Sequence, residues 1–335
     1  IQGNKMIRSA MFPTIVVFVA LLFTAFSPSL AEEKKSADAV ARELANPNAS
    51  QAKLEFENQY YWYKGDLPDA DDQSNYTLLF QPIFPFTLEP TASGGKANFF
   101  FRPAVPFLVD QPVPKVDNGE FDFDEVTALG DTVFDSVYGV TEKNGLLWAV
   151  GTLGTLPTAT DSDVAGGQFR LGPEVLLAKF AKWGILGIFP GHQWDVAGWN
   201  DDYYSTTKTQ FFLIALPGDG WSYGTTPTVY YDWKSHDWTI PLHFKIGKTV
   251  IHDIMPVKYE VEINYFVEQP DEFGPEWLIS FIITPDVPKF IEHWIIGMSL
   301  SNVCSIKYKV GVMFGLGTTE MIIILVLVLI IFGAG

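Results

Sequence analysis

The sequence predicts an all-β fold, an antiparallel transmembrane β-barrel of about twelve strands, an even number as in single-chain bacterial barrels, behind an N-terminal signal peptide. Three observations predict it. Polar and apolar residues alternate along most of the chain, short and long connections alternate between these segments, and aromatic residues gather near the ends of the apolar faces. A period of two is typical of a strand with one polar and one apolar face.

The clearest alternation lies over residues 258–268, which read K-Y-E-V-E-I-N-Y-F-V-E. Val261 and Ile263 fall on one side of this segment, and Glu260 and Glu262 fall on the other. Its length suits a strand that crosses a bilayer at a tilt. Similar patterns predict further strands over 54–64, 74–84, 97–108, 128–140, 145–157, 168–178, 184–196, 205–216, 221–233, 238–249 and 276–284, which together make a barrel over residues 51–290.

The connections between the predicted strands differ in length. Tight turns are expected at 141–144, 179–183 and 217–220, and longer loops rich in Asp, Gly and Pro at 65–73, 109–127, 158–167, 197–204 and 269–275. Short turns on one side and long loops on the other are typical of an outer-membrane barrel, with both termini on the short-turn side.

Alternation alone does not decide between a soluble sandwich, whose apolar faces point inward, and a membrane barrel, whose apolar faces meet lipid. The aromatic residues favour the barrel, because they lie near strand ends on the apolar faces, as in the interfacial girdles of membrane barrels. These residues are Trp221, Tyr223, Tyr231, Trp233, Trp238, Tyr259, Tyr265 and Trp277. We therefore expect the barrel to lie in the outer membrane of a Gram-negative cell.

The chain is acidic, with 22 Lys+Arg against 39 Asp+Glu and a formal charge of -17. Phosphate binding needs clustered Lys and Arg, so nucleic acid is not expected as a partner. Cys304 is the only cysteine, which excludes a disulfide framework, and the five histidines are too dispersed for metal-ligand spacing. We expect no metal and no cofactor. The expected partners are outer-membrane lipid and lipopolysaccharide, small-molecule solutes and the barrel-assembly machinery.

The first residues have the features of an export signal. Lys5 and Arg8 precede an apolar run over residues 11–26, and small residues follow within 29–31, where a signal peptidase reads. A membrane helix is the alternative interpretation of this run. We expect a signal peptide over residues 1–31.

Three other segments are expected outside the barrel. Residues 1–5 precede the natural start, residues 32–50 form a periplasmic segment with a short helix, and residues 291–335 form a hydrophobic extension atypical of such barrels. The aliphatic run over 321–332 is compatible with a membrane helix, which conflicts with a barrel destination. We interpret the extension as read-through past a lost stop or as an assembly artefact, with a genuine anchor as the alternative.

Charged and polar residues on the inward faces are the candidate site. The lumen-lining candidates are Glu55, Glu57, Arg102, Asp131, Asp135, Arg170, Glu174, His243, Lys245, Lys258, Glu260, Glu262 and Asn264. Buried charges without partners are very costly, so these groups must either pair with one another or meet water. A paired network would close the barrel, whereas a wetted array would let small solutes pass.

Several phrases of the sequence resemble a known family. They are A-N-P-N-A-S from Ala45, N-Q-Y-Y-W-Y-K-G-D-L-P from Asn58, F-R-P-A-V-P from Phe101, G-T-L-P-T-A-T-D from Gly154, L-G-P-E-V from Leu171, H-Q-W-D-V-A-G from His192 and Y-F-V-E-Q-P-D-E-F-G-P-E-W from Tyr265. Residues 44–290 thereby resemble Gram-negative outer-membrane proteins described as transporters, or as barrels of the MetA pathway of phenol degradation. The resemblance implies an outer-membrane location and transport, without a ligand or site residues.

Three functions compete. The first is a channel or transporter that passes small solutes, hydrophobic or aromatic ones included, through a charge-lined lumen. The second is a non-conducting structural or surface-binding barrel whose acidic loops hold cations. The third is a lipid hydrolase, which requires a serine beside His192 or His243. Because no serine follows a nucleophile pattern, the sequence favours the interpretation that residues 192–195 are a strand end with an interfacial Trp, and that the chain is not an enzyme.

Overall fold

The structure, a computed structural model, describes residues 36–48, 52–117, 119–199, 203–252 and 255–287. These residues belong to one compact unit. The predicted signal peptide over 1–31, the upstream residues 1–5 and the extension over 291–335 lie outside the described residues, and residues 36–48 are the described part of the segment over 32–50.

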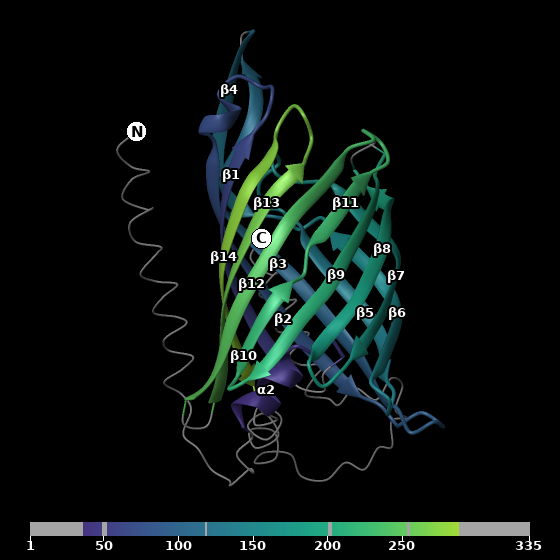
Figure 1. Cartoon of the computed structure of the whole chain (residues 1–335). Helices are drawn as coiled ribbons and strands as arrows, with labels where there is room; N and C mark the ends of the chain where they lie inside the picture. The colour runs from purple at the N-terminus through teal and green to yellow at the C-terminus, as the bar shows by residue number, and fades with distance from the viewer. Residues whose placement is uncertain (1–35, 49–51, 118, 200–202, 253–254, 288–335) are drawn as a thin grey trace, which may run out of the picture. The chain divides into compact units, whose positions relative to one another are not determined.

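Nearly all of the described chain is β-strand (Figure 1), as the alternation of polar and apolar residues predicts. The strands are β1 (Ala52–Lys64), β2 (Ser74–Thr87), β3 (Lys96–Asp117), β4 (Glu120–Leu129), β5 (Thr132–Thr141), β6 (Leu146–Leu156), β7 (Gln168–Phe180), β8 (Gly184–Gly198), β9 (Ser205–Gly218), β10 (Trp221–Thr225), β11 (Thr228–Asp232), β12 (Trp238–His252), β13 (Met255–Glu268) and β14 (Gly274–Val287). Helix α2 (Ala37–Leu44) precedes them, and the short 3-10 turn η1 (Ala70–Asp72) follows β1. Among the described residues, no helix is long and apolar enough to cross a membrane.

The strands form one antiparallel sheet that closes on itself. Consecutive strands pair along the sheet, and the β12–β13, β13–β14 and β14–β1 ladders complete the ring. Strand β4 pairs with β3 off this path, and β10 and β11 lie end to end between β9 and β12, so the barrel has twelve strand positions. The predicted antiparallel barrel of about twelve strands is confirmed.

One strand position is interrupted. Thr226 and Pro227 separate β10 from β11, because proline has no N–H to donate to a ladder. The backbone N–H of Thr226 donates instead to Nδ1 of His243, at 2.9 Å. The strand predicted over 221–233 is thus two short strands, and His243 ties the break to β12.

The two ends of the barrel differ. Tight turns join β5 to β6, β7 to β8 and β9 to β10, and α2 lies at the end of the barrel where these turns are (Figure 1). The connections at the other end are longer than these turns, although β2 and β3 are also joined by a longer connection, residues 88–95, at the short-turn end. By the rule for such barrels, the short-turn end faces the periplasm and the long-loop end faces the outside.

The prediction of a loop over 109–127 is wrong, because most of this connection is strand. Strand β3 continues to Asp117, and β4 runs back beside it as a hairpin. A bulge at Asp110, whose φ is 53°, interrupts the regular ladder of β3 with β4. The alternation F-D-F-D over 121–124 carries the strand signal, which the acidic composition of the segment masks in the sequence.

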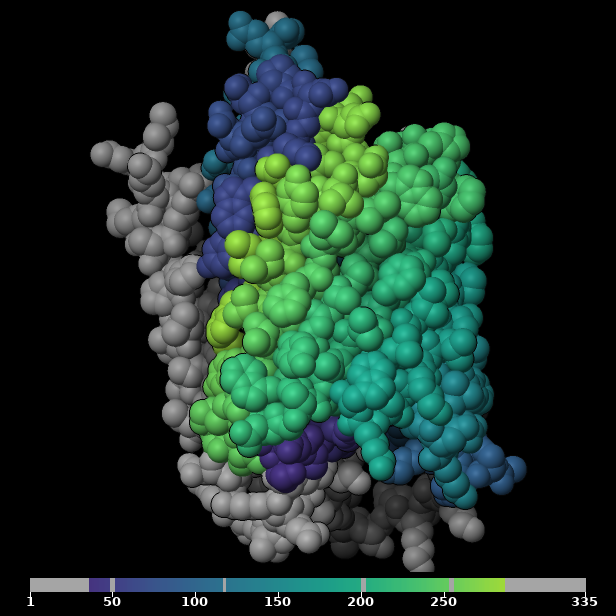
Figure 2. Space-filling model, viewed as in Figure 1, coloured from purple at the N-terminus to yellow at the C-terminus, as the bar shows by residue number. Residues whose placement is uncertain are grey.

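The outer wall is apolar, as predicted for a surface in lipid. Exposed outward side chains include Leu213 on β9, Leu242 and Phe244 on β12, and Val261 and Ile263 on β13. Figure 2 shows the side of the barrel on which β12 and β13 lie. Exposed aromatic residues near strand ends include Trp221, Tyr223, Trp238 and Trp277. A soluble protein does not expose an apolar surface of this extent, whereas a bilayer requires it. The barrel is therefore an outer-membrane protein.

The interior is only partly polar, and here the expectation of polar inward faces is wrong in part. A buried apolar core lies among β3 and β5 to β9, made of Phe100, Val137, Leu147, Ala149, Leu176, Ala178, Ile185, Phe189 and Ile214. Strand β6 shows the reason, because Leu147 and Ala149 are buried while Val150 is exposed. Both faces of this strand are apolar, so its sequence does not mark the inward face.

Candidate functional site in the barrel interior

Asp135 on β5 is the centre of one ionic cluster. Its Oδ2 accepts a hydrogen bond from Nε of Arg102 at 2.6 Å, and its Oδ1 lies 3.4 Å from Nζ of Lys208. Arg102 is on the adjacent strand β3, but Lys208 is on β9, four positions along the sheet order. The Asp135 side chain is 4% exposed. The Lys208–Asp135 ion pair therefore reaches across the barrel interior.

A second ionic cluster lies on β12 and β13. Nζ of Lys245 is 3.0 Å from Glu262 and 3.5 Å from Glu260, and Nζ of Lys258 is 2.7 Å from Glu260. Nε2 of His243 is 3.5 Å from the second oxygen of Glu262. All of these side chains are buried or nearly so. The predicted inward face of 258–268 thus pairs with the inward face of the neighbouring strand.

The inward face of β1 continues the polar lining. Glu55 accepts a hydrogen bond from Thr284 at 3.5 Å. Glu57 accepts one from Nε2 of Gln59 at 2.8 Å, and the hydroxyl of Tyr61 donates to Gln59 at 3.4 Å. Glu57, Gln59 and Tyr61 thus contact one another along one strand, as the period of two requires, and Glu55 contacts the neighbouring strand β14.

The other predicted residues have different settings. Glu174 on β7 is 2% exposed and lies opposite Gly191, where an added Cβ would come within 3.1 Å of the Cβ of Glu174. Asn264 is buried on β13. The guanidinium of Arg170 lies over the ring of Tyr204, 3.7 Å from its centre.

Asp131 lies between β4 and β5, so the prediction that it lies within a strand over 128–140 and lines the lumen is wrong. Its carboxylate accepts hydrogen bonds from the backbone N–H groups of Ala159 at 3.0 Å and Gly166 at 2.9 Å. These bonds hold the long connection between β6 and β7. Asp131 therefore stabilises the β6–β7 connection and is not part of the wall, because β5 begins one residue later.

Sequence reasoning missed three interior residues. Lys208 completes the Asp135 cluster, and its inward position follows the alternation of β9. Lys53, buried on β1, donates to the backbone oxygen of Leu44 at 2.8 Å, at the C-terminal end of α2. Asp286 is buried near the end of β14. Lys53 and Asp286 fall beside the boundaries predicted for their strands, where the pattern is weakest.

The interior also contains open space. Tyr230 on β11 is directly opposite Lys208 in the ladder with β9, so the two side chains share the inward face. Yet Tyr230 is 42% exposed. A solvent-accessible side chain on the inner face of a closed barrel requires a water-sized space beside it. This space lies nearer the long-loop end than the apolar core does.

Helix α2 covers the other end of the interior. Its Val40 and Ala41 are buried. Asp38 accepts a hydrogen bond from the backbone N–H of Gly220 at 2.6 Å, and Arg42 donates to the backbone oxygens of Ala181 and Lys182 in the β7–β8 turn. The helix is thus fixed to two turns at the periplasmic end.

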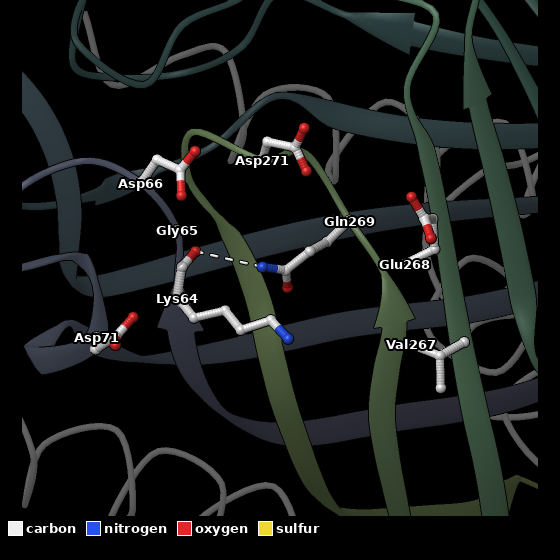
Figure 3. Close-up of a pocket in the computed structure, with 8 residues that line it drawn as sticks. All are labelled: Lys64, Gly65, Asp66, Asp71, Val267, Glu268, Gln269 and Asp271. Atoms are coloured by element: carbon white, nitrogen blue, oxygen red, sulfur yellow. Dashed lines mark hydrogen bonds between the residues drawn. The ribbon is translucent and has the colours of Figure 1, made fainter.

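A cavity of about 350 Å³ lies at the long-loop rim (Figure 3). It is lined by Lys64, Gly65, Asp66, Asp71, Val267, Glu268, Gln269 and Asp271. Nε2 of Gln269 donates to the backbone oxygen of Lys64 at 3.4 Å and joins the two loops. In the described part of the chain, no group of three or more His, Cys, Asp or Glu side chains is placed to hold a metal ion.

No family model matches this sequence, and no curated protein matches it. Among solved structures, the COG4313 outer membrane channel from Pseudomonas putida F1 is similar with a TM-score of 0.47 and 8% identity, over 77% of this chain and 98% of that chain. Outer membrane phospholipase A from Escherichia coli follows with a TM-score of 0.38 and 12% identity, over 76% and 99%. The β domain of the Bordetella autotransporter BrkA has a TM-score of 0.35 and 8% identity, over 70% and 98%. The resemblance to the MetA-pathway family is not confirmed by these matches.

Proposed function

We propose that this chain is an outer-membrane channel that passes small solutes, hydrophobic or aromatic ones included, through a charge-lined lumen. The observation that carries the proposal is the exposed Tyr230 inside a closed barrel. It supports a water-accessible vestibule that opens toward the long loops. Below it, charged side chains pair across the interior, and we expect the passage beside them to be narrow.

The ionic clusters would set the size and charge of what passes. The Lys208–Asp135 pair crosses the interior, so a solute must pass beside it or displace it. Because most of the charges are paired, the field in the passage is weaker than an unpaired ring of carboxylates would produce. Tyr61 and Tyr230 add apolar ring surface to the same polar lining, which suits solutes with an apolar part.

Planar-bilayer recording of the full chain tests this proposal. We expect small single-channel conductance in the parent protein. Lys208→Ser shortens the side chain that crosses the interior and should raise the conductance. Lys179→Ser is the matched control, because Lys179 binds the backbone oxygen of Asn144 in an exposed turn of the wall. Absence of conductance and of solute flux in liposomes for both the parent and Lys208→Ser would overturn the proposal.

The rim cavity favours a second candidate function, a non-conducting barrel that binds cations or partners at its surface. Asp66, Asp71 and Asp271 line the cavity beside Lys64. They are not placed to coordinate one ion together, but their carboxylates attract hard cations from solution. This function predicts calcium-dependent binding of the full chain to anionic vesicles without any solute flux. Flux that does not depend on calcium would favour the channel instead.

A further inference from the structure

Adjacent strands place an imidazole beside two hydroxyl groups on the outer wall. In the β8–β9 ladder, His192 is opposite Thr207, and Trp194 is opposite Ser205. All four residues share a face with the exposed Ile188 of the same wall, because side chains two residues apart point the same way. This cluster therefore faces lipid, near the long-loop end of the barrel.

The contacts connect the three polar groups in a row. Nε2 of His192 lies 3.2 Å from Oγ of Ser205, and Nδ1 lies 2.7 Å from Oγ1 of Thr207. Nε1 of Trp233 donates to the same Thr207 oxygen at 2.9 Å. With the imidazole proton on Nδ1 and directed at Thr207, Nε2 is free to accept the proton of the Ser205 hydroxyl. A nucleophile, a base and a group that orients the base are thus within hydrogen-bond reach.

An apolar groove adjoins this row. It has a volume of about 200 Å³ and is lined by Thr207, Thr209, Val229, Tyr231, Trp233 and Trp238. Thr207 and Trp233 belong to both the groove and the polar row. Since the groove opens on the wall that faces lipid, we assign it to a fatty acyl chain of a lipid in the surrounding leaflet.

We propose that Ser205, His192 and Thr207 form an acyl-ester hydrolase site that acts on membrane lipids. This activity is separate from passage through the lumen, and it competes with the expectation that the chain is not an enzyme. The sequence shows no nucleophile motif because the serine and the histidine come from different strands. Their proximity depends on the register of β8 against β9.

The reaction has two balanced steps. Oγ of Ser205 attacks the ester carbonyl carbon while its proton passes to Nε2 of His192, and the bond to the lipid alcohol breaks as that alcohol takes the proton. Water then attacks the acyl-serine, loses a proton to Nε2, and the serine recovers the proton as the fatty acid leaves. Thr207 is a positioning residue that holds the imidazole tautomer. Ser205 is 3% exposed, and we expect movement of Trp194, whose ring centre is 4.2 Å from that of His192, to uncover it.

The test measures fatty acid release by the full chain in phosphatidylethanolamine vesicles, together with covalent labelling by a long-chain fluorophosphonate. We expect release above that of protein-free vesicles and a label on Ser205. Ser205→Ala and His192→Ala should each lower the rate by about a hundredfold or more. Thr207→Val should lower the rate and Thr207→Ser should restore it, because only the hydroxyl is needed. Trp194→Ala should speed labelling of Ser205.

Thr152→Val is the matched control, because Thr152 shares the outer face of β6 with the exposed Val150 and belongs neither to the groove nor to the polar row. It should keep the parent rate. Heat-modifiable gel mobility checks that each variant is a folded barrel. Release no faster than from protein-free vesicles, parent-level release by Ser205→Ala, or a label on another residue would overturn the proposal and leave the channel proposal unaffected.

Discussion

Some carboxylates in the barrel interior each form ion pairs with two basic side chains. Asp135 binds Arg102 and Lys208, and Glu262 lies against Lys245 and His243. In such a place, removing one charge leaves its partners buried without a counter-charge, which costs far more than the intact pair contributes. We therefore infer that the interior pairs hold the inward faces in register more than they add net stability.

Asp135→Asn tests this at one residue. The substitution keeps the shape of the side chain but removes its negative charge, so the buried cations Arg102 and Lys208 lose their shared counter-charge. We expect the free energy of unfolding to fall by about 3–5 kcal/mol, measured by urea unfolding in lipid vesicles with tryptophan fluorescence as the signal.

The control for this prediction is Asp124→Asn in the β3–β4 hairpin. Asp124 pairs with Lys115 at 2.5 Å, but the two side chains are 49% and 52% exposed. Solvent screens such a pair, so its loss should change the free energy of unfolding by less than about 1 kcal/mol. Equal losses in the two variants would contradict a buried ionic centre.

At the scale of elements, α2 depends on the barrel for its place. A helix of 8 residues is too short to be stable alone in water. Ser36 caps it by accepting a hydrogen bond from the backbone N–H of Ala39 at 3.2 Å, and Lys53 donates to its last carbonyl groups, where a cation is favoured. Its position across the periplasmic end is thus set by side chains that bind to turns of the wall.

The double variant Asp38→Ala, Arg42→Ala should release α2. Each hydrogen bond to a charged group contributes about 1.5–3 kcal/mol. Loss of the Asp38 and Arg42 hydrogen bonds should therefore shift the equilibrium strongly toward a state in which α2 has left the end of the barrel. We expect higher conductance and faster proteolysis of the segment around residues 36–48. Lys179→Ala is the matched control. Lys179 also donates to a turn oxygen at this end of the barrel, that of Asn144, but it does not bind α2. Conductance equal in the parent and the double variant would exclude α2 as an obstacle.

At the scale of the whole molecule, the sequence predicts the wall better than the interior. Alternation is local, so the strand ranges and the inward faces of β1 and β13 follow directly from it. Contacts across the barrel, such as Lys208–Asp135, depend on how many strands separate the partners. The contact of Ser205 with His192 depends on register, and the apolar core arises where both faces of a strand are apolar, as in β6. None of these is visible in a single segment.

The apolar outer face of β13 allows a prediction about how the cost of a charge depends on its depth in the bilayer. Ile263 and Val267 are both exposed on the outer face of β13, at 41% and 48%. Ile263 is nearer the middle of the strand, and Val267 is next to its long-loop end. Arginine on the lipid face costs about 2–4 kcal/mol at the bilayer midplane but about 0–1 kcal/mol near the interfaces.

Ile263→Arg should therefore lower the free energy of unfolding in vesicles several times more than Val267→Arg does. A soluble barrel or sandwich would respond differently, because two exposed positions of similar accessibility would tolerate arginine about equally. Urea unfolding of both variants in the same lipid separates these cases. The two substitutions share a strand, an outer face and the introduced arginine, and Val267 also lines the rim cavity beside aspartates that would favour a cation. Equal small losses in the two variants would refute a lipid-facing wall.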